Sequence, residues 1–249
     1  MARSPAREHY IRTLAAQEAA KRAAGQIRPD ATLYEQMLAK LHQDRLRLKQ
    51  VQSGEAKGAL KAELLPEYFD YLHGVLEADA GGEDEVMATC MVWAIDGGRF
   101  DVALQLAGYV LKHKLALPDR FTRTVGCVVA EEIAEAALKK LAAGETFDEL
   151  TLNEAGELTS TEDMPDEVRA KLHMATGRVI MRDHDPETAP QSRALLGDAV
   201  MHLRRAIELH NACGAKKDLE RAERALKNAP PAQPSPTTEP PPPAAPPAG

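Results

Sequence analysis

Aromatic residues are scarce in this chain, at 4% of 249 residues, and no stretch alternates Val, Ile, Thr or aromatic residues with polar ones. Such alternation is the pattern of a half-buried strand, so its absence argues against a β-sheet. Ala, Leu, Glu, Lys and Arg abound instead, and these residues lose little freedom in a helix. The composition therefore predicts an all-α fold, a multi-helix bundle of helical hairpins.

Cysteines and long apolar runs are also few. Cys90, Cys127 and Cys213 lie far apart and form no C-x-x-C pair, so we expect small buried apolar residues in a reducing cytosol. No run approaches the roughly 20 apolar residues of a membrane span. Residues 1–14 carry charges in place of the apolar core of a secretory signal. We therefore expect a soluble, intracellular protein with no membrane partner.

The motifs of self-contained catalysis are missing as well. Gly54–Gly58 has the wrong spacing for a phosphate-binding loop and no Ser or Thr after a Lys, so the chain is not expected to be an ATPase. Dinucleotide-binding, zinc-protease, zinc-finger and nucleophile-elbow patterns are absent. No catalytic residue can be assigned from motifs.

Three acidic groups leave a metal-dependent reaction open as an alternative; they are Glu83-Asp84-Glu85, Glu162-Asp163 with Asp166-Glu167, and Asp183-His184-Asp185. A two-metal nuclease needs carboxylates that converge from separate elements. The first two groups lie at predicted helix starts, where the helix dipole already favours acids. The third suits Mg²⁺ or Mn²⁺ in principle but lies on a predicted loop. His202 and His210 are two turns apart, too far to share an ion. We predict capping and solvated roles for these residues, and no metal site.

Charge is distributed unevenly along the chain. The net charge is −7, but residues 1–61 hold twelve basic and six acidic residues, or +6, which leaves −13 for the remainder. Such asymmetry is typical of a segment that binds a polyanion. A solvated basic helix face is the alternative. Under the first interpretation the DNA-binding residues are Arg3, Arg7, Arg12, Lys21, Arg22 and Arg28.

Capping and breaking residues divide the chain into helices. Ser4-Pro5 opens a first, Ala-rich helix with little apolar face, which we expect to order against a partner or DNA. Thr32 to Glu35 is a capping box that starts a second helix. In this second helix apolar residues recur at steps of four and three, with one polar break at Arg45, as in a short coiled-coil seam. Intramolecular packing and oligomerisation both remain open for that seam.

The remaining capping and helix-breaking residues predict helices over about 67–77, 83–96, 100–115, 125–143 and 164–182. Two more helices, separated at Gly214, are predicted after them. Residues 145–163 are polar and non-periodic, and a loop is predicted there. The tail, 229–249, holds ten prolines and is expected to be disordered. The predicted units are a basic helical arm for DNA binding or oligomerisation (1–61), a helical core (62–144), the loop (145–163), C-terminal hairpins (164–228) and the tail.

Several segments resemble one known family. They are Thr32–Leu41, Glu63-Leu-Leu-Pro66, Asp84–Gly98, Phe100–Leu117 with Pro118, Phe121-Thr-Arg-Thr124 and Met164–His173. In order and spacing they are similar to the small terminase subunit of peduovirus-type tailed phages, over roughly residues 28–228. Members of that family have a basic C-terminal tail, whereas this chain ends in neutral Pro and Ala.

The resemblance implies a part of the machine that packages viral DNA. A protein of this family would bind the cohesive-end site on concatemeric double-stranded viral DNA in the host cytoplasm. Its partner would be a large terminase subunit that hydrolyses ATP, and a homo-oligomer, including a ring, is expected because small terminases elsewhere form rings. The family is also described as the terminase endonuclease subunit, so a metal-dependent endonuclease using Mg²⁺ is one alternative. A helical adaptor without DNA contact is a second alternative. No cofactor is otherwise expected.

Overall fold

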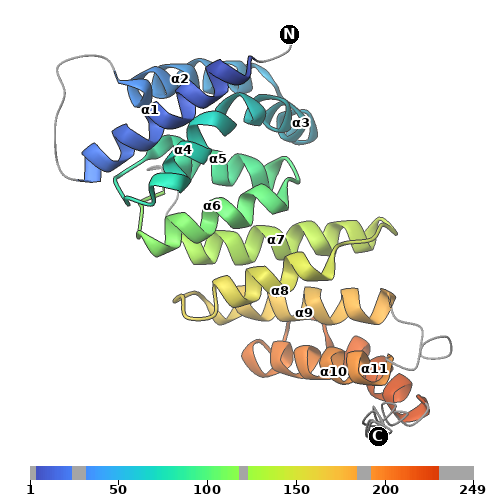
Figure 1. Cartoon of the computed structure of the whole chain (residues 1–249). Helices are drawn as coiled ribbons and strands as arrows, with labels where there is room; N and C mark the ends of the chain where they lie inside the picture. The colour runs from blue at the N-terminus through green and yellow to red at the C-terminus, as the bar shows by residue number, and fades with distance from the viewer. Residues whose placement is uncertain (1–3, 24–31, 118–122, 184–191, 230–249) are drawn as a thin grey trace, which may run out of the picture.

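The computed structural model describes residues 4–23, 32–117, 123–183 and 192–229. Every regular element in these ranges is helical and none is a strand, which confirms the all-α prediction. The helices form an elongated stack that runs from the N-terminal to the C-terminal end of the described chain (Figure 1). Over the same ranges, no helix is long and apolar enough to cross a membrane.

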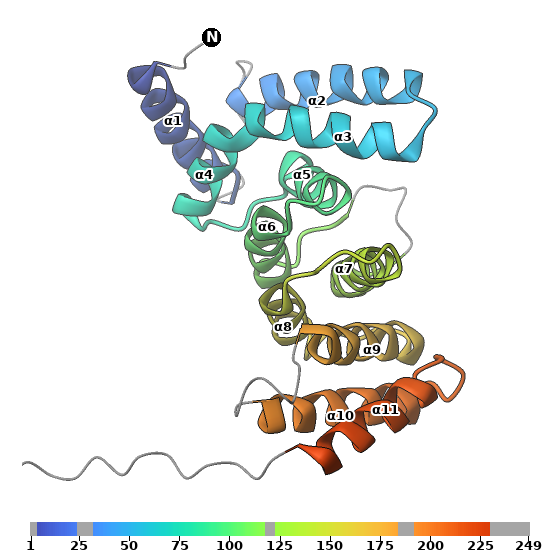
Figure 2. The ribbon, with the colours of Figure 1, turned by 90° about the vertical axis from the view of Figure 1, so that its right-hand side faces the viewer.

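The first part of the stack contains α1 (Pro5–Ala23), α2 (Leu33–Gln50), α3 (Gly54–Leu64), the 3₁₀ helix η1 (Leu65–Tyr68) and α4 (Phe69–Ala78). The capping box of α2 is present as predicted: the Glu35 amide donates to the Thr32 hydroxyl over 3.3 Å, and the Thr32 amide donates to the Glu35 carboxylate over 2.6 Å. Ser53 caps α3. Helices α2 and α3 form a hairpin, side by side in Figure 2.

The middle contains α5 (Glu85–Asp96), α6 (Phe100–Lys112) and α7 (Val125–Ala142). Helix α5 is buried from Val86 to Ile95, because neighbouring helices cover it on all sides. Its Trp93 is fully buried and meets Tyr68 edge to face, with ring centroids 6.1 Å apart. This contact joins the helical hairpins on either side into one core.

The loop predicted over 145–163 is wrong, because α8 (Glu149–Leu158) occupies most of it. The Asp148 carboxylate accepts from the backbone amides of Leu150 and Thr151 and so starts the helix. Only Leu152 and Ala155 are buried. A ten-residue helix with two buried apolar residues carries almost no periodic signal, which is why the pattern indicated a loop.

The stack ends with α9 (Asp166–Asp183), α10 (Ser192–Leu209) and α11 (Lys216–Asn228). The main core extends from Ala15 to Val179, and a second, smaller core lies between α9, α10 and α11. Gly177 permits a close approach of α9 and α10, since a Cβ atom there would lie 2.7 Å from Cγ of Leu203. The predicted tail beyond Ala229 and the loop residues His184 and Asp185 lie outside the described residues.

Candidate nucleic-acid interface

The structure describes the side chains of two of the six cations predicted to bind DNA, Arg7 and Arg12. Arg3 and Arg28 lie outside the described residues, as do the side chains of Lys21 and Arg22. Arg7 is exposed on α1. Arg12 is half-buried and forms an ion pair with Glu77 of α4 over 3.7 Å. The described residues therefore neither support nor contradict a contact between this set and DNA.

The first helix is not a free arm. Ala15 and Ala19 of α1 are buried against the body, and α1 packs along α4. Gly74 of α4 makes the close approach possible, because any Cβ there would overlap the carbonyl oxygen of Arg12. The expectation that this helix orders only against a partner or DNA is therefore wrong: small residues on both helices replace the large apolar face that it lacks.

A basic groove lies between α2 and α3. Its volume is about 510 Å³, and its lining consists of His42, Arg45, Leu46, Leu48, Lys49, Lys57, Lys61 and Trp93. Five of these eight side chains are His, Lys or Arg, and none is acidic. In a chain with a net charge of −7, this is a local concentration of positive charge.

Helical spacing explains why the groove is basic along its length. On α2, His42, Arg45 and Lys49 are three and four residues apart, so they share one face. On α3, Lys57 and Lys61 are one turn apart and face them across the hairpin. Two rows of basic side chains thus line the groove. Leu46 is its exposed apolar side chain, and the buried Leu48 and Trp93 line it from the core.

Two of the four lysines and arginines of the groove are fixed by partners from α5. Arg45 donates to the Glu85 carboxylate over 2.5 Å and to the Thr89 hydroxyl over 2.8 Å. Lys61 forms an ion pair with Asp96. Among the residues that the structure describes, no carboxylate lies within ion-pair distance of Lys49 or Lys57. The groove therefore combines two positioned cations with an exposed lysine, Lys49, and a partly buried one, Lys57.

The sequence contained a signal for this groove that the prediction did not use. All four of its lysines and arginines belong to the basic segment 1–61, but they follow the six residues chosen for DNA contact. Arg45 was interpreted as a polar break in an apolar seam. The structure shows that the seam packs within the chain, with Leu41 and Leu48 buried, and that Arg45 reaches α5.

The first two acidic groups lie at helix starts. Asp84 is buried, caps α5 through the Met87 amide at 2.9 Å, and accepts from the Tyr71 hydroxyl at 2.5 Å. Asp166 and Glu167 lie in the first turn of α9. No group of three or more His, Cys, Asp or Glu side chains within the described ranges could hold a metal ion. The capping role predicted for the 83–85 group is confirmed.

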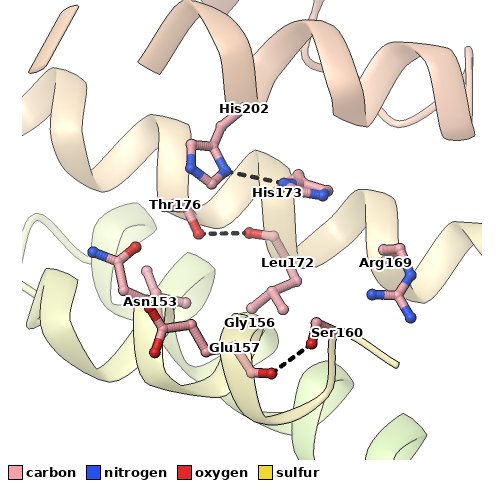
Figure 3. A pocket seen from close by; sticks show the side chains of 10 residues that line it. Asn153, Gly156, Glu157, Ser160, Arg169, Leu172, His173, Thr176 and His202 are labelled. Carbon is pink, nitrogen blue, oxygen red and sulfur yellow. Dashed lines mark hydrogen bonds between the residues drawn. The ribbon is translucent and has the colours of Figure 1, made fainter. Parts of the chain in front are cut away.

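A second concave site lies between α8, α9 and α10, with a volume of about 440 Å³ (Figure 3). His173 and His202 line it, and their Nδ1 atoms are 2.9 Å apart. Burial lowers the pKa of His173 to about 4 and also lowers that of His202. The sequence offered no signal for this pair, because 29 residues separate its members.

Comparisons with known proteins agree with one another. A family model described as phage small terminase subunit matches residues 38–167, which include all but the first residues of the hairpin that forms the groove and most of the stack below it. The terminase, endonuclease subunit, of Escherichia phage P2 is 44% identical over 235 residues, which cover 94% of this chain and 90% of that protein. No solved structure matches.

Proposed function

Because the chain belongs to the phage small terminase subunit family, we propose that it binds the cohesive-end packaging site on concatemeric viral DNA. In this role it works with a large ATP-hydrolysing terminase subunit in the host cytoplasm to start genome cutting and packaging. The family relation supports a part in the initiation of DNA packaging. The basic groove between α2 and α3 is the observation that gives this part a physical site.

The groove suits the phosphate backbone. Phosphate contacts require flexible or bidentate cations rather than a shaped pocket for bases, and they supply most of the non-specific affinity for DNA. Lys49 is exposed and Lys57 is partly buried, and neither is ion-paired among the described residues, so binding a phosphate breaks no ion pair there. Arg45 and Lys61 are held by Glu85 and Asp96 of α5, whose carboxylates offset part of their charge.

The predicted residues of the first helix extend this surface in the proposal. Arg7 is exposed on α1, and Arg3, Arg12, Lys21, Arg22 and Arg28 belong to the same basic segment. A homo-oligomer, such as a ring, would array several copies of the segment along one DNA molecule. Repeated weak contacts would then act together with a high effective concentration.

A metal-dependent endonuclease remains the second candidate, favoured by the printed name of the relative from phage P2. Mg²⁺ or Mn²⁺ added to the purified chain with duplex DNA that contains the cohesive-end site separates the two candidates. Nicking at high protein concentration would establish the second, whereas binding without nicking supports the first.

Groove variants test the first candidate directly. We expect Lys49→Ala/Lys57→Ala to lower duplex affinity about tenfold at roughly 0.1 M salt, because two phosphate contacts are lost. The slope of log K against log salt should fall by about two. The measurement is fluorescence anisotropy with labelled duplex DNA over a salt series.

The matched control is Lys216→Ala/Lys217→Ala, which removes the same charge from exposed residues at the start of α11. Its affinity should stay within about twofold of the unaltered chain. An equal loss in both variants would mean that net charge alone controls binding. If the unaltered chain shows no duplex affinity at low salt, the DNA proposal itself fails, and the helical adaptor is left.

A further inference from the structure

His173 and His202 face each other between α9 and α10. His173 lies near the middle of α9, and His202 lies near the middle of α10. Their ring centroids are 5.1 Å apart, with 47° between the ring planes, and Figure 3 shows the two rings converging above the pocket. The facing atoms are both Nδ1, at 2.9 Å.

We propose that these two imidazoles bind a borderline divalent transition-metal ion, Ni²⁺ or Zn²⁺, through their Nδ1 atoms. Imidazole nitrogen is a ligand that suits both ions. Nitrogens about 2.0–2.1 Å from one ion and 2.9 Å from each other subtend an angle of about 90° at it. This is the angle between neighbouring ligands of an octahedral or square-planar ion; a tetrahedral Zn²⁺ would require the rings to separate slightly further.

The two facing Nδ1 atoms are close enough to share either a proton or an ion. Without an ion, the 2.9 Å separation fits a hydrogen bond in which one Nδ1–H donates to the other Nδ1. With an ion, both rings carry their proton on Nε2 and both Nδ1 lone pairs point at the metal.

Charged groups of both signs lie near the pair: Asp198 and Glu149 act on His202, and Arg205 and Arg169 act on His173. Two protein ligands do not complete the coordination of either ion. The pocket below the rings leaves space for water molecules as the remaining ligands.

A bound ion would join the C-terminal hairpin to the rest of the stack. Helices α10 and α11 attach to the body mainly through α9, and the smaller core lies at this junction. An ion that binds only the folded junction stabilises it by mass action. The inference concerns the end of the chain opposite the basic groove and is independent of DNA binding.

Calorimetric titration of the full chain, prepared without a histidine tag, with NiCl₂ and separately with ZnCl₂ tests the site. We expect one ion of at least one of these metals per chain, and a rise in Tm of a few degrees at saturating metal. His173→Ala and His202→Ala should each weaken the affinity at least tenfold. His210→Ala is the matched control, since it removes a partly exposed histidine from the end of α10 and should bind like the unaltered chain.

A second measurement on the unaltered chain guards against variants that fail to fold. Substoichiometric Ni²⁺ is paramagnetic and should broaden the ring-proton signals of His173 and His202 before those of the other histidines. If neither metal binds, if affinity is unchanged in His202→Ala, or if other histidines broaden first, the site does not exist.

Discussion

Asp44 shows how a single buried residue fixes the orientation of α2. Its side chain is 5% exposed and accepts hydrogen bonds from Lys40 at 2.5 Å, from the Tyr68 hydroxyl at 2.7 Å and from Arg47 at 3.2 Å. Tyr68 belongs to η1 and is fully buried. This network holds one face of α2 against the core, and the opposite face presents His42 and Lys49 to the groove.

Replacing Asp44 should therefore destabilise the whole chain. Asp44→Ala leaves the buried Tyr68 hydroxyl without its acceptor, and we expect a loss of about 2–4 kcal/mol in the free energy of unfolding. Asp44→Asn keeps an acceptor oxygen and should lose about half as much. Urea denaturation at pH 7 is the measurement. Asp101→Ala removes an exposed carboxylate paired with Arg99 and should change stability by less than about 1 kcal/mol.

The same variants have an expected pH dependence. Burial by itself raises the pKa of Asp44, but the hydrogen bonds from Lys40 and Tyr68 outweigh it and hold that pKa below its ordinary value of 3.8. A depressed carboxyl pKa contributes stability that is complete above 3.8 and is lost as the pH falls through the folded-state value. The gap between the unaltered chain and Asp44→Asn should be constant from neutral pH to about pH 5 and narrow below 3.8. A gap that widens in acid would contradict this account.

At the scale of elements, the junction of α1 with α4 depends on one glycine. A Cβ atom on Gly74 would overlap the Arg12 carbonyl oxygen and lie 2.8 Å from Cβ of Ala15. We expect Gly74→Ala to cost about 1–3 kcal/mol, because backbone cannot move aside as a side-chain tip can. Amide hydrogen exchange should accelerate in α1 more than in α5.

Gly54→Ala is the control for this substitution. No atom lies within 4 Å of a Cβ built at Gly54, and the residue starts α3. The change should be neutral or stabilise the chain by up to about 1 kcal/mol, since alanine loses less backbone entropy on folding. Similar destabilisation in both variants would show that helix propensity, and not the close approach, controls the Gly74 effect.

The helices that could be predicted from the sequence are those whose ends are determined by residues close to them in the chain. Three such ends were located because each depends on residues within one turn: the capping box at Thr32, the acidic start at Asp84 and the break at Gly97. Helix α8 was missed because its burial rests on two residues. The docking of α1 was missed because the stabilising feature, Gly74, lies far along the chain from it.

The two candidate sites also differ in whether residues close together in the chain determine them. Each row of the basic groove repeats at helical spacing on one helix, so the charge along the sequence indicated the segment that contains the groove, while the six residues chosen within that segment are others and stay a prediction. The pairing of His173 with His202 depends on how α9 crosses α10, which Gly177 and Leu203 determine. No local sequence pattern predicts how these two helices cross.

At the scale of the whole molecule, contacts run mainly between helices that are neighbours in the stack. The main contacts of α10 are with α9 and α11, whereas α2 contacts α1, α3 and α5. The basic groove and the histidine pair therefore lie toward opposite ends of the stack (Figure 2). In structures of this kind stability is close to a sum of terms for each unit and its neighbours, so damage at one end need not reach the other.

Gly177→Ala tests this independence. The added Cβ would meet Cγ of Leu203 at 2.7 Å, so we expect α10 and α11 to exchange amide hydrogens faster while α2 and α3 keep their rates. Duplex affinity should stay within about twofold, because the groove is untouched. Gly197→Ala lies in α10 with no atom within 4 Å of its Cβ and should leave all four helices unchanged. Equal acceleration in α2 and α10 would mean that the stack unfolds as one cooperative unit, and the groove could then not be separated energetically from the C-terminal hairpin.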